Sequence, residues 1–128
     1  MNNPSKFLGN ELKYLEKVLN ADSWSSNSGS WTSSLEKAFS KKFDSKYGIA
    51  FNSGTSTLHA ALNSLGVQAG DEVIQPPLTV ISNVAVTIAQ NAIPVFADID
   101  PETFNIDPAK AEDAITGKTR AFLPVHLF

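Results

Sequence analysis

Hydrophobic residues in the first part of the chain recur at helical spacing. Over residues 5–20 every third or fourth position is apolar, which predicts an amphipathic helix with the stripe Leu8, Leu12, Leu15 and Leu19. Residues 21–32 form a polar loop rich in serine and asparagine. Ser33 and Glu36 have the spacing of a capping box, and they predict a second helix with the stripe Leu35, Ala38, Phe39 and Phe43.

From residue 47 onward, short apolar runs alternate with helical patterns. Strands are expected at 47–51, 72–75, 93–97 and 120–125, and helices at 58–65, at 81–88 and after Asp107-Pro108. Gly66 is expected to end the helix at 58–65. The strands are apolar on both faces. This order therefore predicts an α/β fold with three layers (α/β/α), in which helices cover both faces of a mostly parallel sheet.

Three candidate site segments lie where the expected strands end. Asn52-Ser53-Gly54, the segment 76–79 and Asp98 all follow such strands, so they are expected at one edge of the sheet, where ligands of these folds bind. The turn at Gly54 also opens a helix, and free amides at a helix start attract anions such as phosphate. Two interpretations stay open: an anion site, or a simple cap in which Ser53 or Thr55 bonds the free amides.

Composition narrows the function classes. The chain has 128 residues, a net charge of −3 and no cysteine. These features argue against a nucleic-acid binder and exclude disulfides and thiolate metal sites. The polar N-terminus and the lack of a long apolar run predict a cytoplasmic protein that does not span a membrane. Because residues 123–128 read as an unfinished strand, we expect the chain to be the first part of a longer protein.

Other residues that could carry chemistry each have a simpler interpretation. His59 is expected to pack in its helix, whereas a role for His126, at the end of a strand, is an open question. Asp98 and Asp100 favour turn formation over a metal site, because no third ligand has a supporting spacing. For Trp24 and Trp31, packing on the chain's own core and contact with a partner or substrate are both open.

The segment Phe51 to Leu62 resembles the SGT-x-AL segment of the DegT/StrS-type sugar aminotransferases, which are pyridoxal phosphate enzymes of the aspartate-aminotransferase fold. The resemblance continues through residues 70–74, 76–79 and 94–108 and ends at residues 124–128. It therefore covers nearly the whole chain from about residue 30, in order and with matching spacing. This combination of segments is highly specific.

The resemblance implies roles for individual residues. Gly54, Thr55 and Ser56 match positions that hold the phosphate of pyridoxal 5'-phosphate, and His126 matches the histidine of the family's VHLxG segment. Val80 matches a position where the family usually places an aromatic ring against the cofactor. The aspartate that pairs with the pyridine nitrogen and the lysine that attaches the cofactor lie beyond the last matched strand. We therefore expect no catalytic residue and no metal ligand in this chain, and no activity from it alone.

The function that the resemblance implies is transfer of an amino group, usually from glutamate, to a nucleotide-linked keto sugar. A homodimer is implied, with residues 1–32 as an N-terminal helix and interface loop, and 33–128 as the first part of the cofactor-binding domain. Two alternatives remain open. One is a sugar dehydratase of the same family, and the other is a non-catalytic phosphate-binding or regulatory module on the same fold.

Overall fold

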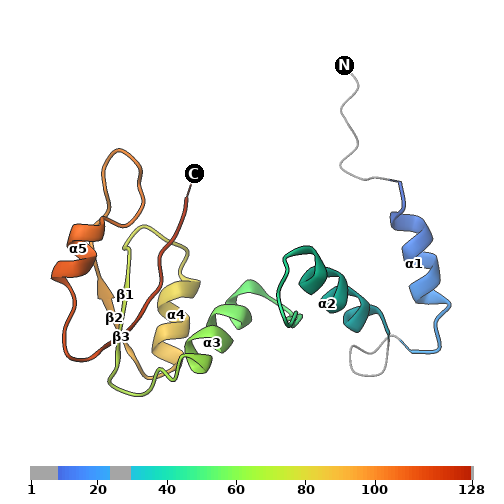
Figure 1. Cartoon of the computed structure of the whole chain (residues 1–128), viewed down its shortest axis with the longest axis horizontal. Helices are drawn as coiled ribbons and strands as arrows, with labels where there is room; N and C mark the ends of the chain where they lie inside the picture. Colours follow the sequence, from blue (N-terminus) through green and yellow to red (C-terminus); the bar gives the residue numbers. More distant parts are fainter. Residues whose placement is uncertain (1–8, 24–29, 128) are drawn as a thin grey trace. The chain divides into compact units, whose positions relative to one another are not determined.

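The computed structural model describes residues 9–23 and 30–127 (Figure 1). The chain divides into two compact units, Met1–Ala50 and Phe51–Phe128, and each is described by itself. No helix in the described ranges is both long enough and apolar enough to cross a bilayer.

The first unit consists of α1 (Glu11–Leu19) and α2 (Ser30–Lys42). Both expected helices are present, although neither contains a buried residue, and the apolar stripe residues that the structure describes are exposed. Trp31 instead packs edge-to-face against Tyr14, with ring centroids 6.2 Å apart. This contact favours the packing interpretation for Trp31. Trp24, and the part of the expected first helix before residue 9, lie outside the described residues.

The capping box expected at Ser33 and Glu36 is wrong. The helix α2 already contains Ser30, and the Ser33 hydroxyl donates to the Ser30 carbonyl at 3.1 Å. The carboxylate of Glu36 accepts from the backbone N–H of Ala50 at 2.9 Å. Ser33 and Glu36 therefore form hydrogen bonds with other partners, one inside α2 and one after it. Their spacing in the sequence does not mark the start of this helix.

The second unit is an α/β unit. Its elements in chain order are α3 (Gly54–Ser64), β1 (Glu72–Gln75), α4 (Ser82–Ala89), β2 (Ile93–Phe96), α5 (Pro108–Asp113) and β3 (Thr119–Phe122). The three strands are parallel in the order β2-β1-β3, with Val73 opposite Pro94 on one side and Ala121 on the other. The connection β1–α4–β2 therefore moves to one side of β1, and the connection through α5 returns the chain to the other side.

Helices cover both faces of this sheet, as the sequence predicts. On one face, Val73 of β1 packs with Leu62 of α3 and Val86 of α4. On the other face, Ile74 packs with Ala97 and with Ala111 of α5. Figure 1 shows the strands between α4 on one side and α5 on the other. The alternation of Val73 and Ile74 between two cores is the period-two pattern of a strand buried on both faces.

The expected strand at 47–51 is absent. Residues 47–51 belong to no strand, and Tyr47 and Ile49 are 71% and 72% exposed. A strand exists only where a neighbour accepts its hydrogen bonds, and in the described ranges β1 pairs with β2 and β3 alone. The last strand is also shorter than expected, because it ends at Phe122.

Two local signals at helix ends are confirmed. Gly66, which follows the C-cap of α3, has a φ of +72°, a left-handed conformation that glycine adopts without strain. Asp107 caps α5, because its carboxylate accepts from the Ala109 N–H at 2.8 Å while Pro108 takes the first helical position.

Candidate functional site: the start of helix α3

The start of α3 combines a capped turn with open space. Ser53 is the N-cap in an extended conformation, and its hydroxyl accepts from the Ser56 N–H at 3.2 Å. The amides of Gly54 and Thr55 donate to no acceptor among the described residues. A Cβ built on Gly54 would meet no atom within 4 Å. The cap therefore uses one of the first amides and leaves others free, so both interpretations of this turn are compatible.

Hydroxyl groups surround these free amides. The Ser56 hydroxyl donates to the Asn52 side-chain oxygen at 2.8 Å and lies 3.0 Å from the Ser53 hydroxyl. The Thr55 hydroxyl lies 2.9 Å from the hydroxyl of Ser82, at the start of α4. Amides at a helix start together with hydroxyl donors form a suitable site for a dianionic phosphate, because the helix dipole adds positive potential there. The residues present therefore fit the phosphate of a pyridoxal cofactor.

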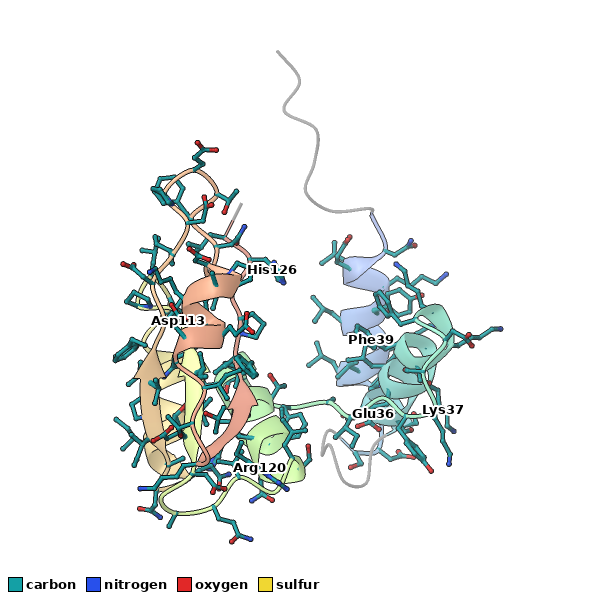
Figure 2. The ribbon with its side chains drawn as sticks, turned by 60° about the vertical axis from the view of Figure 1, so that its left-hand side comes forward. Glu36, Lys37, Phe39, Asp113, Arg120 and His126 are labelled. Carbon is teal, nitrogen blue, oxygen red and sulfur yellow. The ribbon has the colours of Figure 1, made fainter. Side chains whose placement is uncertain are left out.

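Val80 and His126 follow neighbouring strands. Val80 lies in the loop between β1 and α4 and is 62% exposed, while His126 is exposed on the segment after β3 (Figure 2). β1 and β3 are adjacent and parallel, so the segments that follow them begin at the same edge of the sheet, where ligands of such folds bind. Among the described residues no hydrogen bond joins Val80 or His126 to the start of α3, so a shared role of these residues stays a prediction.

The acidic loop after β2 forms turns. Asp98 accepts from the Ile99 N–H at 2.9 Å. The Asp100 carboxylate accepts from the Thr103 and Glu102 amides at 2.9 and 2.8 Å, and these bonds hold its pKa below the usual value. Residues 9–23 and 30–127 contain no cluster of three acidic, histidine or cysteine side chains that could hold a metal ion. Turn formation by Asp100 is therefore confirmed.

His59 is exposed rather than packed inside the fold, so its expected packing role is wrong. Together with Phe51, Ser56 and Asn63 it lines a surface hollow of about 400 Å³ on α3. The expectation of burial rests on the position of His59 next to Leu58, one residue from the apolar stripe of its helix. The sheet covers only the narrower face of α3 that carries Leu62 and the half-buried Leu58.

Sequence reasoning missed two residues near this edge. Nothing in the sequence links Ser82 to Thr55 across 27 positions, so no pattern predicts their contact. Gln75 is fully buried at the end of β1, and neither atom of its amide has a partner among the described residues. A polar residue at the end of an apolar strand was the available signal for Gln75.

Known proteins match this chain along most of its length. The sequence model of the DegT/DnrJ/EryC1/StrS aminotransferase family matches residues 7–128. The chain is 43% identical over 120 residues to the GDP-perosamine synthase of Caulobacter vibrioides, a match that covers 94% of this chain and 32% of that protein. It is 41% identical over 122 residues to the L-glutamine:2-deoxy-scyllo-inosose aminotransferase of Streptomyces kanamyceticus, covering 91% of this chain and 29% of that protein.

A solved structure agrees with these relatives. The structure of NtdA from Bacillus subtilis with bound cofactor PMP superimposes with a TM-score of 0.81 and 38% sequence identity, over 91% of this chain and 26% of that one. The chain thus spans about a third of the length of the curated relatives that it matches.

Proposed function

The chain belongs to the DegT/DnrJ/EryC1/StrS aminotransferase family, and from this premise we propose that it forms the N-terminal part of a pyridoxal phosphate-dependent enzyme that aminates a keto sugar. The observation that carries the proposal is the start of α3, where free amides at Gly54 and Thr55 lie among hydroxyl groups. That arrangement suits a phosphate, and the solved relative NtdA holds PMP.

Within this proposal, Gly54, Thr55 and Ser56 bind the cofactor phosphate. Gly54 contributes its amide and the space in front of it, since no atom lies within 4 Å of a Cβ built there. Thr55 and Ser56 add hydroxyl groups to the amide donors. When it is bound, the cofactor carries the amino group and serves as the electron sink for the transfer. The contribution of this chain is to hold and orient the phosphate end.

Val80 and His126 complete the proposed cofactor site. Val80 places an aliphatic side chain against the ring, where an aromatic residue would stack, and its 62% exposure leaves that face open. His126 is proposed to approach the ring from the segment after β3. The sheet topology supports these two roles, because the segments that carry Val80 and His126 follow neighbouring parallel strands at the same edge of the sheet.

The proposed acceptor is a nucleotide-linked keto sugar, and the proposed amino donor is glutamate. The relatives named above are a GDP-perosamine synthase and an enzyme whose name gives L-glutamine as donor, so glutamine is the natural comparison in a donor assay. We place the enzyme in the cytoplasm as a homodimer, with residues 1–32 contributing to the subunit interface and residues 33–128 to the cofactor-binding domain. Exposed apolar side chains on α1, among them Leu12 and Leu19, support an interface in this region.

The substitution Gly54→Trp tests the phosphate site. In the complete enzyme we expect it to abolish retention of pyridoxal phosphate, because the indole would fill the space in front of the free amides. The matched control is Gly117→Trp, since Gly117 also has no atom within 4 Å of a built Cβ and lies in the loop between α5 and β3. Cofactor content is measured by absorbance after gel filtration. Normal cofactor retention by the Gly54 variant would refute the proposal.

A further inference from the structure

We propose that Ser82 is a positioning residue for the phosphate site, acting through Thr55 from a second helix. The inference rests on the proposed function, since it assigns a role to a neighbour of the phosphate-binding residues. Its observation is the hydroxyl–hydroxyl contact of 2.9 Å between Thr55, in the first turn of α3, and Ser82, the first residue of α4.

The contact joins two helix starts that the core already fixes. Leu62 of α3 and Val86 of α4 are both buried, at 2% exposure each, in the same cluster on the sheet. The positions of Thr55 and Ser82 are therefore set by packed helices rather than by a free loop. A hydroxyl pair held in this way restricts the χ1 rotamer of Thr55, which an exposed threonine would otherwise share among several states.

Ser82 has no competing task among the described residues. The N-cap of α4 is Ile81, which makes no side-chain cap bond, and the only hydrogen bond of the Ser82 hydroxyl is the one to Thr55. Thr57 and Ser64 of α3, in contrast, donate their hydroxyls to carbonyls of their own helix. The Ser82 hydroxyl is thus directed across to α3 instead of back to α4.

The direction of the bond matters for anion binding. A hydroxyl has one proton, so in the pair one oxygen donates and the other keeps a free proton. When Ser82 donates to Thr55, the Thr55 proton is free to donate to a phosphate oxygen. A hydrogen bond to an anion is roughly twice as strong as one between neutral groups. The hydrogen bond from Ser82 also polarises the Thr55 hydroxyl, which strengthens its bond to the phosphate further. Phosphate binding would therefore select this direction, and Ser82 would contribute without touching the anion.

The test compares two ligands that differ only in the phosphate. Equilibrium dissociation constants for pyridoxal phosphate and for pyridoxal are measured in the complete enzyme with Ser82→Ala, Ser82→Thr, Thr55→Val and the double variant Ser82→Ala/Thr55→Val. We expect Ser82→Ala to weaken the binding of pyridoxal phosphate roughly tenfold, since about one charge-assisted bond is affected. The affinity for pyridoxal should not change. Ser82→Thr should keep wild-type affinity. Ser64→Ala is the control for loss of a hydroxyl from α3.

Additivity identifies the route of the effect. If Ser82 acts through Thr55, the double variant should bind pyridoxal phosphate about as tightly as Thr55→Val alone. Additive losses would overturn the inference, and so would equal weakening of both ligands or unchanged affinity in Ser82→Ala. A wild-type enzyme with no preference for the phosphorylated ligand would instead refute the phosphate site itself, and with it the proposed function. If circular dichroism shows that Ser82→Ala does not fold, the folded Ser82→Thr variant decides. Loss of its selectivity for the phosphorylated ligand would overturn the inference, and retention of that selectivity would support the inference.

Discussion

At the scale of single residues, Gln75 has a side chain whose polarity conflicts with its surroundings. It follows Ile74 at the carboxyl end of β1, is fully buried, and neither its amide oxygen nor its amide nitrogen has a partner in the described ranges. By the alternation of the strand it lies on the same face as Val73, toward α3 and α4. An unpaired buried polar group costs about 1–3 kcal/mol, so this position reduces the stability of the fold.

The substitution Gln75→Leu is expected to stabilise the second unit by about 1 kcal/mol, because it removes the unpaired amide and keeps a similar volume. Urea unfolding monitored by circular dichroism gives the change in free energy. The control is Gln68→Leu, an exposed glutamine whose side chain has no hydrogen bond in the described residues, which should change stability by less than about 0.5 kcal/mol. A destabilised Gln75 variant would show that the amide is paired in solution.

Val80 is a second residue with a clear test. We expect Val80→Phe in the complete enzyme to tighten binding of pyridoxal phosphate roughly threefold to tenfold, because a stacked ring contributes about 0.5–1.5 kcal/mol. The side chain is 62% exposed, so a larger group can be accommodated. Ile81→Phe is the matched control, since Ile81 is the next residue and is 75% exposed. Fluorescence titration that shows equal or weaker binding for Val80→Phe would place Val80 away from the ring.

At the scale of elements, the carboxylate of Asp100 stabilises a turn in the loop between β2 and α5. Asp100 accepts from the amides of Thr103 and Glu102, and the bridge between Ile99 and Ile106 closes the loop behind it. Because these bonds favour the charged form, its folded-state pKa lies below the usual value of 3.8. The carboxylate therefore stabilises the fold above the unfolded-state pKa, and this contribution is lost as the pH falls through the lower folded-state pKa.

The lowered folded-state pKa of Asp100 determines how the effect of Asp100→Asn on stability depends on pH. We expect the variant to be less stable than the wild type at neutral pH, and the difference to shrink only below about pH 4. Chemical unfolding between pH 7 and pH 2 measures both proteins. Asp113→Asn serves as the control, because Asp113 is exposed at the end of α5 and makes no hydrogen bond through its carboxylate in the described residues (Figure 2). A difference that is constant down to pH 2 would contradict the assignment.

Elements whose signals are local could be predicted from the sequence, and elements that depend on distant partners could not. Gly66 and Asp107 each act within a few residues, so the C-terminus of α3 and the N-terminus of α5 could be predicted from the sequence. The segment 47–51 has a strand-like composition, although a strand also needs a neighbour, and the described residues supply none. The same division holds at the site, where the turn at Gly54 is visible in the sequence and the bond from Thr55 to Ser82 is not.

At the scale of the whole molecule, the two units differ in how they bury apolar surface. The second unit has a core on each face of its sheet, with Val73 on one side and Ile74 on the other, both at 0% exposure. In the first unit, α1 and α2 contain no buried residue. Stability should therefore depend mainly on side chains of residues 51–127 that pack against the sheet.

Truncation of Leu62 tests this distribution. We expect Leu62→Ala to destabilise the second unit by about 2–5 kcal/mol, because its side chain is 2% exposed between the sheet and α3 and would leave a cavity. Leu65→Ala is the matched control, since Leu65 is at the C-cap of the same helix and is 55% exposed. Thermal and urea unfolding measure both variants. Similar losses for the two leucines would contradict the assigned core.

The central place of β1 in the sheet also has a consequence for biosynthesis. β1 is the first of the three strands to be translated, yet its two partners, β2 and β3, come later in the chain. At about 5–20 residues per second, the ribosome needs on the order of seconds to deliver β3 after β1. During that interval the strand that is most buried in the finished sheet has an open edge in the nascent chain, so this is the period in which a chaperone would have the greatest effect on yield.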